Sequence, residues 1–473
     1  MGLPLNQNSV SMQILSLARS DVYRKPLKTI YYGLLLLAMM NSICIDVRTS
    51  LPMPADMRNR LVGARMMKDG LSPYFYIWKT GGPERYYDTY VGPNAYVSLS
   101  TSTPFFHAIM GSLFDMPQYQ INIIWMIIQY MCLIGCVLLA VFSLPERYRN
   151  HAFKIAAFFA VLFSYTDGWR IHIHQDQNYI FIPLLALACF YCIQQKNNVF
   201  YYFLFAMAAT SMILLRPITV LFFTPLVFYP LRYYKMGVAT SIALVVYIIF
   251  VWFTPIQKQN WTEYFQSMKV HIENHQSLKP ILPPVANDPI SIKNLEGVSI
   301  VSGYDSLKVA QLNQRAENSN FFIFYNKITG GKISILAMSI MGVGLGIILL
   351  LPMFVYIKRK VILPSFLLFI LGFAVYNTYE FFTPVTRLAY HWVQILFPIL
   401  LVVVWQRKIY LLPLIFLLLG MLLSMGIFTS IKMVHNLGEG LVMLALLYCV
   451  YRPLWNRVPE TEPLSVKRRL YYV

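Results

Sequence analysis

Residues 28–45 read KTIYYGLLLLAMMNSICI, an almost uninterrupted apolar run. A helix needs roughly 20 mostly apolar residues to cross the hydrocarbon core of a bilayer. About 27 polar and basic positions precede the run, and they lack the layout of a cleaved signal peptide. The run therefore predicts a first membrane-spanning helix that the chain retains.

Apolar runs of this kind recur along all 473 residues, of which 57% are hydrophobic and 12% charged. A soluble domain carries about 25% charged residues. We therefore expect an all-α polytopic membrane protein of about twelve spans. They are predicted at residues 28–45, 120–143, 152–166, 178–194, 199–214, 216–231, 237–254, 333–357, 361–379, 388–405, 409–431 and 435–451.

The formal net charge of +19 reflects basic residues in the predicted cytoplasmic loops, and it does not indicate a nucleic-acid partner. Lys and Arg gather in short clusters between apolar runs, as the positive-inside rule expects of cytoplasmic loops. An even number of spans then places both termini in the cytoplasm, in what we expect to be a bacterial plasma membrane. Two larger segments, 46–119 and 255–332, are expected on the outer face. They divide the chain into a module at 1–254, an outer loop at 255–332 and a C-terminal part at 333–473.

The cysteine pattern indicates neither a disulfide framework nor a metal knuckle. All six cysteines lie in or beside apolar segments, and Cys189 and Cys192 share CxxC spacing inside a predicted span. We predict no cofactor, and the pattern leaves open whether a divalent cation is needed.

The first outer loop begins PADMRNRLVGARMMKDGLSPYFYIW, residues 54–78. Asp56 after Pro54 is typical of a helix start, and Gly70 of a helix end, which predicts a helix at 57–69. In one interpretation Asp56 only caps this helix, with Arg60 as a surface partner. In the other it is a general base at the membrane surface. A second short helix, too short to span, is predicted at 104–114.

The segment DGWRIHIHQDQNY, residues 167–179, is predicted on the same face. If it is extended, Arg170, His172 and His174 lie on one side, where they would contact a phosphate or a sugar. A metal site is a weaker interpretation because no third ligand is near. A polar hairpin at the water interface is the remaining one.

Two further groups of ionisable residues adjoin apolar sequence. Arg387 and His391 are four residues apart, so one helical face would carry both as an anion clamp. Glu380 precedes them and Tyr390 lies beside them; interfacial anchoring by Tyr390 and Trp392 explains the pattern equally well. Arg216 directly before Pro217 is functional if it lies at membrane depth and merely snorkels if it lies at the interface.

Taken in order, residues from about 40 to 240 resemble glycosyltransferase family 87, the polyprenyl-phosphate-mannose-dependent mannosyltransferases of the GT-C superfamily. Asp56, Asp69-Gly70 and Ser72-Pro73-Tyr74 resemble the family's D…G-x-x-P-Y opening. Thr103-Pro104-Phe105 resembles its second, proline-led helix, Gln177-Asn178 its G-Q-x-N helix start, and Arg216-Pro217 its later Lys-Pro. The chain departs from the pattern at Asp176, where the family has glycine, and at Arg216, where it has lysine.

The resemblance implies a GT-C-like helical bundle and an inverting transfer of mannose, or another hexose or pentose, from a polyprenyl-phosphate donor. The acceptor would be a lipid-linked or cell-envelope glycan, and Asp56 the general base. The implied donor-phosphate ligands are Arg170, His172, His174, Arg216, Arg387 and His391; the implied sugar or acceptor ligands are Tyr74, Gln177, Asn178, Glu380 and Tyr390. The aromatic residues Tyr76, Trp78, Tyr86 and Tyr87 are candidates to stack on sugar faces or to anchor at the interface.

Two other classes fit the composition. A polysaccharide polymerase or ligase also has about a dozen spans and one large outer loop, but the loop at 255–332 contains a single arginine, Arg315. A transporter or flippase of lipid-linked sugars predicts internal repeats and ionisable residues in the middle of spans. No repeat is present, so the enzyme interpretation is preferred.

Overall fold

The computed structural model describes residues 21–49, 55–74, 83, 86, 100–111, 113, 116–195, 198–275, 320–329, 333–359, 363–383, 387, 389–405, 411–425 and 434–455. Within these ranges the chain is helical and contains no β-strand, with one isolated bridge between Thr166 and Met425. The predicted all-helical fold is thereby confirmed.

The helices follow one another along the chain with these bounds: α2 Asp21–Thr49, α3 Ala55–Lys68, α4 Pro104–Met110, α5 Gln118–Phe142, α6 Glu146–Phe163, α7 Asp167–His174, α8 Phe181–Gln194, α9 Val199–Leu215, η2 Pro217–Phe223, α10 Thr224–Val227, α11 Pro230–Phe253, α12 Pro255–His275, α14 Phe321–Thr329, α15 Ile335–Lys358, α16 Ser365–Phe381, η5 Ala389–Ile395, α17 Leu396–Trp405, α18 Leu411–Leu423 and α19 Val434–Trp455.

Among the described residues, four helices are long and apolar enough to cross a membrane: Pro26–Thr49, Gln120–Phe142, Pro230–Phe253 and Ile335–Lys358. Side chains such as Ile242, Val246 and Phe250 of α11 point away from the protein and are more than half exposed. A surface this apolar is compatible with contact to lipid. Other predicted spans correspond to apolar helices of 10–17 residues, so the number twelve stays a prediction.

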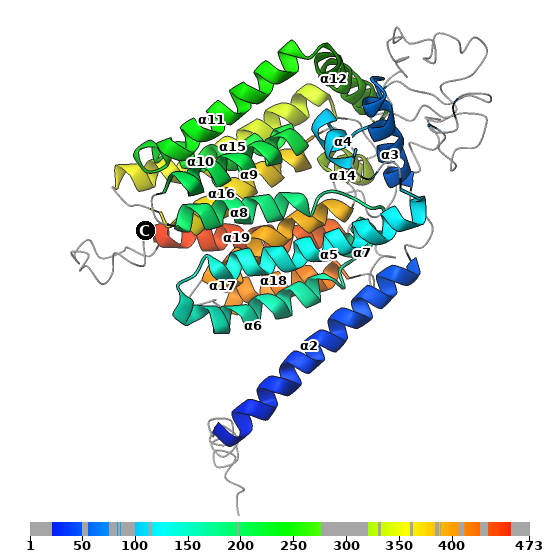
Figure 1. Ribbon diagram of the computed structural model, residues 1–473. Helices are drawn as coiled ribbons and strands as arrows, with labels where there is room; N and C mark the ends of the chain where they lie inside the picture. Colours follow the sequence, from blue (N-terminus) through cyan, green and yellow to red (C-terminus); the bar gives the residue numbers. More distant parts are fainter. Residues whose placement is uncertain are drawn as a thin grey trace, which may run out of the picture.

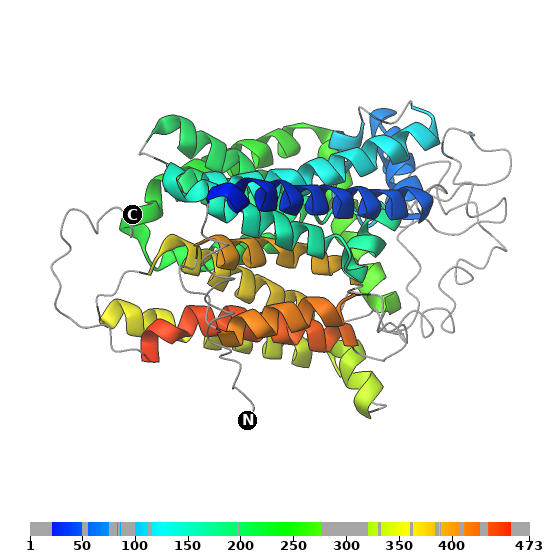
Figure 2. The same ribbon diagram turned by 90° about the horizontal axis from the view of Figure 1, so that it is seen from below.

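The short helices gather at one end of the bundle. Figures 1 and 2 show the long helices running side by side, with α3, α4, α7, α12 and α14 together at one end, hereafter the loop end. Arg149 near the start of α6, Arg232 near the start of α11, and Lys358 at the end of α15 lie toward the opposite end. These three basic residues lie apart from the short helices, although the loop end has arginines of its own, such as Arg60 in α3 and Arg170 in α7.

Helices α16 and α17 form the centre of the bundle and are buried almost throughout. The half-length segment η2–α10 packs against α16 at Gly372. A Cβ atom built on Gly372 would collide with the backbone carbonyl of Phe222. Glycine is required here because two backbones approach each other more closely than any side chain allows.

Several predicted elements have different bounds in the structure. Helix α3 begins at Ala55, so Asp56 lies inside its first turn and is not the residue before it. The end of α3 is confirmed, since Gly70 has φ 76° and the Leu71 amide donates to the Met66 carbonyl at 2.9 Å, a left-handed helix end. Helix α4 ends at Met110, four residues early.

Two other predictions of local structure were wrong. Segment 167–174 is the helix α7 and not an extended strand, because Thr166 caps it by accepting from the Trp169 amide. The predicted span 216–231 is only the short segment η2–α10. The alternative interpretation of the sequence, in which 199–231 is a pair of half-helices broken at Arg216-Pro217, agrees with the break, because Pro217 disfavours helical geometry at Arg216, which has φ −151° and ψ 96°.

Replacing Gly372 by alanine tests this packing. We expect Gly372→Ala to lower the free energy of unfolding by about 1–3 kcal/mol or more, since the added methyl meets backbone that cannot rotate away. Gly344→Ala in α15 is the matched control, because nothing lies within 4 Å of the position that its Cβ would take. Thermal unfolding of the purified proteins in detergent measures both, and equal melting temperatures would contradict the packing argument.

Candidate functional site

Arg216 stands at the loop end between α9 and η2. Its Nε atom lies 2.5 Å from Glu380 Oε1 in the last turn of α16. The Arg216 side chain is 25% exposed, whereas that of Glu380 is 1% exposed. The pair therefore consists of a buried carboxylate and an arginine whose side chain is partly exposed, although its Nε atom is buried.

Aromatic rings surround this guanidinium. Its Cζ atom lies 4.9 Å from the centre of the Tyr179 ring. Tyr179 stacks on Tyr390 at a centroid distance of 5.3 Å and contacts His391 at 4.3 Å. The structure thus brings together four segments of the chain, and with them the predicted site residues Arg216, Glu380, Tyr390 and His391.

Arg387 belongs to the same cluster, but Glu439 neutralises its charge. Its Nη1 and Nη2 atoms lie 2.5 and 2.6 Å from the two carboxylate oxygens of Glu439 in α19, and Nη2 lies 2.7 Å from Asn377 Oδ1. Arg387 Nε is 3.9 Å from Glu380 Oε2. Arg387 precedes η5 and so does not share a helical face with His391, contrary to the prediction.

The side chains that complete this cluster as hydrogen-bond partners were not predicted from the sequence. The Tyr376 hydroxyl lies 2.5 Å from both Glu380 Oε1 and Gln394 Oε1, and Asn377 donates to Glu439 Oε1 at 2.8 Å. Glu439 was the one detectable member, since it is an ionisable residue inside the apolar run 435–451. Tyr376, Asn377 and Gln394 carry no such signal.

Helix α3 is attached to the rest of the loop end by Arg60. Its Nη1 atom donates to the Asp176 carbonyl at 2.6 Å, its Nη2 to Gln177 Oε1 at 2.6 Å, and its Nε to Ser102 Oγ at 3.2 Å. Arg60 is only 7% exposed. The expectation of a surface partner was wrong for Arg60, and Gln177 serves as an acceptor for it.

Asp56 lies one helical turn before Arg60 in α3, and its side chain lies outside the described residues. The same holds for Tyr76, Trp78 and Tyr87 as whole residues. The two described tyrosines among these candidates are buried. Tyr74 donates to the Ser102 carbonyl at 2.9 Å, and Tyr86 to Asp69 Oδ2 at 2.5 Å.

Because α7 is a helix, His172 lies on a different side from Arg170 and His174, which are four residues apart. His174 is exposed and Asn178 beyond it is partly exposed, whereas His172 is completely buried. Neither ring nitrogen of His172 has a hydrogen-bond partner among the described residues. No group of three His, Cys, Asp or Glu side chains in the described part of the chain is placed to hold a metal ion.

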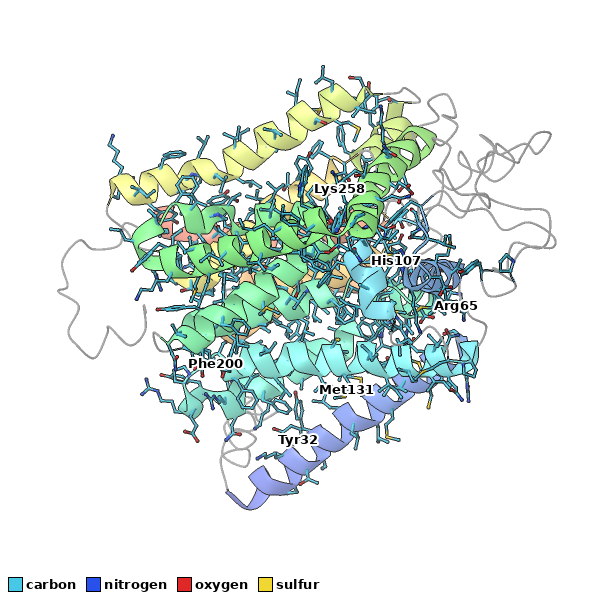
Figure 3. All side chains as sticks on the ribbon, turned by 45° about the horizontal axis from the view of Figure 1, so that its top comes forward. Tyr32, Arg65, His107, Met131, Phe200 and Lys258 are labelled. Carbon is cyan, nitrogen blue, oxygen red and sulfur yellow. The ribbon has the colours of Figure 1, made fainter. Side chains whose placement is uncertain are left out.

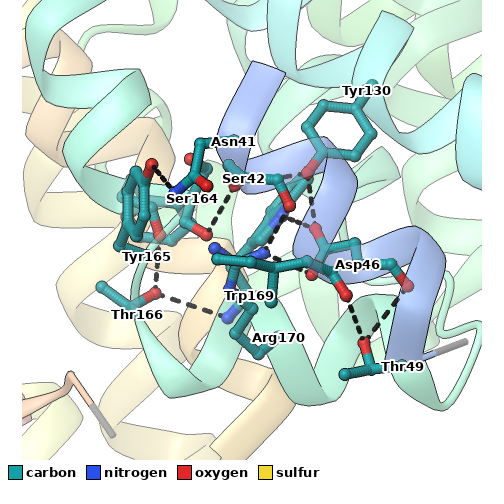
Figure 4. A network of polar contacts seen from close by, with 12 residues as sticks. Asn41, Ser42, Asp46, Thr49, Tyr130, Ser164, Tyr165, Thr166, Trp169 and Arg170 are labelled. Atoms are coloured by element: carbon teal, nitrogen blue, oxygen red, sulfur yellow. Dashed lines mark hydrogen bonds and ion pairs between the residues drawn. The ribbon is translucent and has the colours of Figure 1, made fainter. Parts of the chain in front are cut away.

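The third residue of that set, Arg170, belongs to a separate network (Figure 4). Its Nη1 atom lies 2.5 Å from Asp46 Oδ1 in the last turn of α2. Asp46 Oδ2 accepts from Tyr130 at 2.5 Å and from Trp169 at 3.2 Å. This buried carboxylate connects α2 to α5 and α7, and it neutralises the charge that Arg170 would offer to a phosphate.

The Asp46–Arg170 pair can be tested by a double-mutant cycle. Arg170→Ala should cost about 3–5 kcal/mol in the free energy of unfolding, because it leaves the buried Asp46 carboxylate unpaired. Asp46→Ala should cost less, because the Arg170 side chain that it leaves unpaired is 19% exposed. The double variant should cost less than the sum of the two, by about 1 kcal/mol or more. Unfolding in detergent measures the three values. Additive costs would show that the two residues stabilise the fold independently.

Stability should also fall in acid because two buried histidines must stay neutral. Burial lowers the pKa of His107 and of His172 from 6.5 to about 3. A hydrogen bond with the Arg60 backbone opposes this at His107, and the charge of Arg60 lowers the pKa of both histidines further. Between these pH values the unfolded chain binds protons that the folded chain does not. Stability is therefore complete above pH 6.5 and falls toward pH 3, by about 1.4 kcal/mol per pH unit for each histidine.

Melting temperatures between pH 7.5 and 5 measure this effect. His172→Phe keeps an aromatic ring in an environment with no hydrogen-bond partner among the described residues and should flatten the pH slope by about half. His151→Gln, at an exposed position in α6, should leave the slope as it is. An unchanged slope in His172→Phe would refute the assignment.

Comparison with known proteins adds no identification, since no family model, no curated protein and no solved structure matches this chain.

Proposed function

We propose that the protein is a membrane glycosyltransferase. It would move a hexose or pentose, mannose being one candidate, from a polyprenyl-phosphate donor to a lipid-linked or cell-envelope glycan acceptor with inversion. One observation carries the proposal. Arg216, whose side chain is partly exposed, lies over the Tyr179 ring at the loop end, and Tyr179 in turn contacts Tyr390 and His391. A cation beside aromatic faces suits a ligand that joins a phosphate to a sugar.

The chemistry requires a cation where the leaving group forms. The acceptor hydroxyl oxygen attacks the anomeric carbon, the carbon–oxygen bond to the phosphate breaks, and its electron pair stays on the phosphate. A guanidinium aimed at the charge that develops there lowers the barrier. All three arginines have a carboxylate partner, and Arg216 is preferred because its side chain is the most exposed of the three, at 25% against 19% for Arg170 and 3% for Arg387. It also lies against the ring of Tyr179.

In this proposal, Asp56 takes the proton of the attacking hydroxyl. It lies in the first turn of α3, which Arg60 attaches to Ser102 and to residues 176–177 at the same end of the bundle. Because the helix is anchored, a general base on it keeps its position while the acceptor binds and reacts. General-base catalysis contributes typically about 10²–10⁴-fold to a rate.

A transporter of lipid-linked sugars is the second candidate, and one observation favours it. The helix broken at Arg216-Pro217 resembles the discontinuous helices that form substrate sites in transporters. The positions of the buried acids argue against it. Asp46 lies in the last turn of α2, Glu380 in the last turn of α16, and Glu439 in the second turn of α19, all toward the loop end. A transport path would need such groups near the middle of the spans.

Substitution of the two principal residues tests the function. Membranes containing each variant are supplied with radiolabelled polyprenyl-phosphate sugars, and glycan products are counted. Asp56→Asn should reduce transfer at least about 10²-fold with donor binding retained, since only the base is lost. Arg216→Ala should weaken donor binding as well as transfer.

Glu146→Gln and Arg147→Ala change the same residue types at exposed positions in the first turn of α6, toward the opposite end of the bundle. These controls should keep wild-type activity. Full transfer activity in Asp56→Asn would exclude the proposed mechanism.

A further inference from the structure

Helix α12 begins where the exposed apolar helix α11 ends. Trp252 and Phe253, in the last turn of α11, are 64% and 79% exposed. Thr254 then has φ −110° and ψ 100°, a non-helical geometry that a following proline favours, and Pro255 starts α12. Figure 1 shows α12 leaving α11 at an angle and running across the loop end. The predicted outer loop at 255–332 therefore starts with a helix at the depth where α11 stops.

Side-chain contacts hold α12 against its neighbours. Trp261 Nε1 donates to the Tyr247 hydroxyl of α11 at 3.2 Å. The Tyr264 ring contacts the ring of Tyr74 in the first loop at a centroid distance of 5.7 Å. Figure 3, in which Lys258 marks α12, shows this helix beside α4. Contacts with α11 and the first loop thus set the direction in which each face of α12 points.

Two opposite faces of α12 differ in exposure. The face turned to the protein carries three buried residues, Asn260, Tyr264 and Ser267. The face turned away carries four exposed residues spaced four, three and four positions apart, hereafter the lysine stripe: Lys258, Thr262, Phe265 and Lys269. Phe265 is 57% exposed. An exposed phenylalanine between two lysines suits a surface at which apolar and charged surroundings meet.

The two sides of the lysine stripe also differ in polarity. Trp261 and Met268, seven residues apart, are partly exposed on the side turned to α11. The other side carries Gln259, Glu263 and Gln266. Because α11 exposes apolar side chains compatible with lipid, the apolar side of α12 is turned to the bilayer and the polar side to water. The lysine stripe then lies at the boundary between them.

No acidic side chain in the described part of the chain pairs with either lysine of the stripe. Glu263, on the neighbouring side, accepts hydrogen bonds from Ser72 and Gln259 instead. Lys258 Nζ lies 4.1 Å from the centre of the Trp252 ring at the end of α11. Long basic side chains and tryptophan are typical of the membrane–water interface. This contact therefore places an unpaired positive charge where the apolar surface of α11 ends.

We propose that α12 lies in the membrane–water interface and that its lysine stripe binds the headgroups of anionic phospholipids. Lys258 and Lys269 are about 16 Å apart along the helix axis, so they contact separate headgroups, and Phe265 between them lies among the acyl chains. Basic residues near a bilayer are attracted by anionic lipid. Because α12 also contacts Tyr74, headgroup binding holds the first loop at the bilayer surface. This inference does not depend on the proposed glycosyl transfer.

Lipid-selective quenching of the full-length protein tests this surface. Thr262→Cys carries a bimane label in the middle of the stripe, and Cys44→Ser removes an exposed thiol. The protein is reconstituted in phosphatidylcholine vesicles that contain a small fraction of nitroxide-labelled phosphatidylglycerol or phosphatidylcholine, with the nitroxide at the same acyl position. We expect both lipids to quench, with phosphatidylglycerol binding about fivefold more tightly, the value for one lysine near an anionic surface.

The double variant Lys258→Gln/Lys269→Gln removes both charges at exposed positions. It should reduce the preference to less than about twofold, while quenching by phosphatidylcholine persists. Lys235→Gln is the matched control, since Lys235 is an exposed lysine near the opposite end of α11 with its Nζ 6.0 Å from the centre of the Tyr234 ring. It should leave the preference unchanged. Because all three lysines are exposed, each variant should keep the melting temperature of the parent protein.

Three outcomes would overturn the inference. Absence of quenching by both lipids would place α12 away from the bilayer. Equal quenching by the two lipids in the labelled parent protein would show that the stripe does not select anionic headgroups. A preference that survives in Lys258→Gln/Lys269→Gln would show that other residues cause it.

Discussion

A charge inside an apolar bundle must be paired, and this constraint organises the loop end of the protein. Removing an ion from water costs several kcal/mol, which only a close and well hydrogen-bonded partner offsets. Glu380, Glu439 and Asp46 each have an arginine within 2.5 Å. Each pair joins elements from different parts of the chain. Charges that would destabilise the bundle if unpaired therefore hold its helices together at the loop end.

The same constraint distinguishes the arginines by function. Arg387 is 3% exposed and held by both oxygens of Glu439, and Arg60 is fixed by three acceptors. Both stabilise the arrangement of helices. Arg216 has one carboxylate partner, an aromatic neighbour and a quarter of its side chain exposed. Its side chain is the most exposed of the three, which is why the proposed function is centred on this residue.

The sequence was a good guide where a property depends on residues close together in the chain. Apolar length predicted the helices, and Gly70 predicted the end of α3, because both depend on local geometry. The resemblance and the charge pattern singled out Arg216, Glu380, Tyr390 and His391 as site residues, and the structure brings them together. Alternation of Arg170, His172 and His174 was misleading, because period-two spacing describes a strand and the Thr166 cap makes the segment helical.

Partners could not be predicted in the same way, because a contact between α16 and α19 or between α2 and α7 depends on how the whole chain packs. Glu439 could be noticed as a charge in an apolar run, but nothing in the sequence says that it binds Arg387 and Asn377. The sequence by itself determined an all-helical chain with apolar helices long enough to cross a membrane, since hydrophobicity acts locally. Only the tertiary structure decided which arginines are neutralised, because ion pairing depends on distance in space and not along the chain.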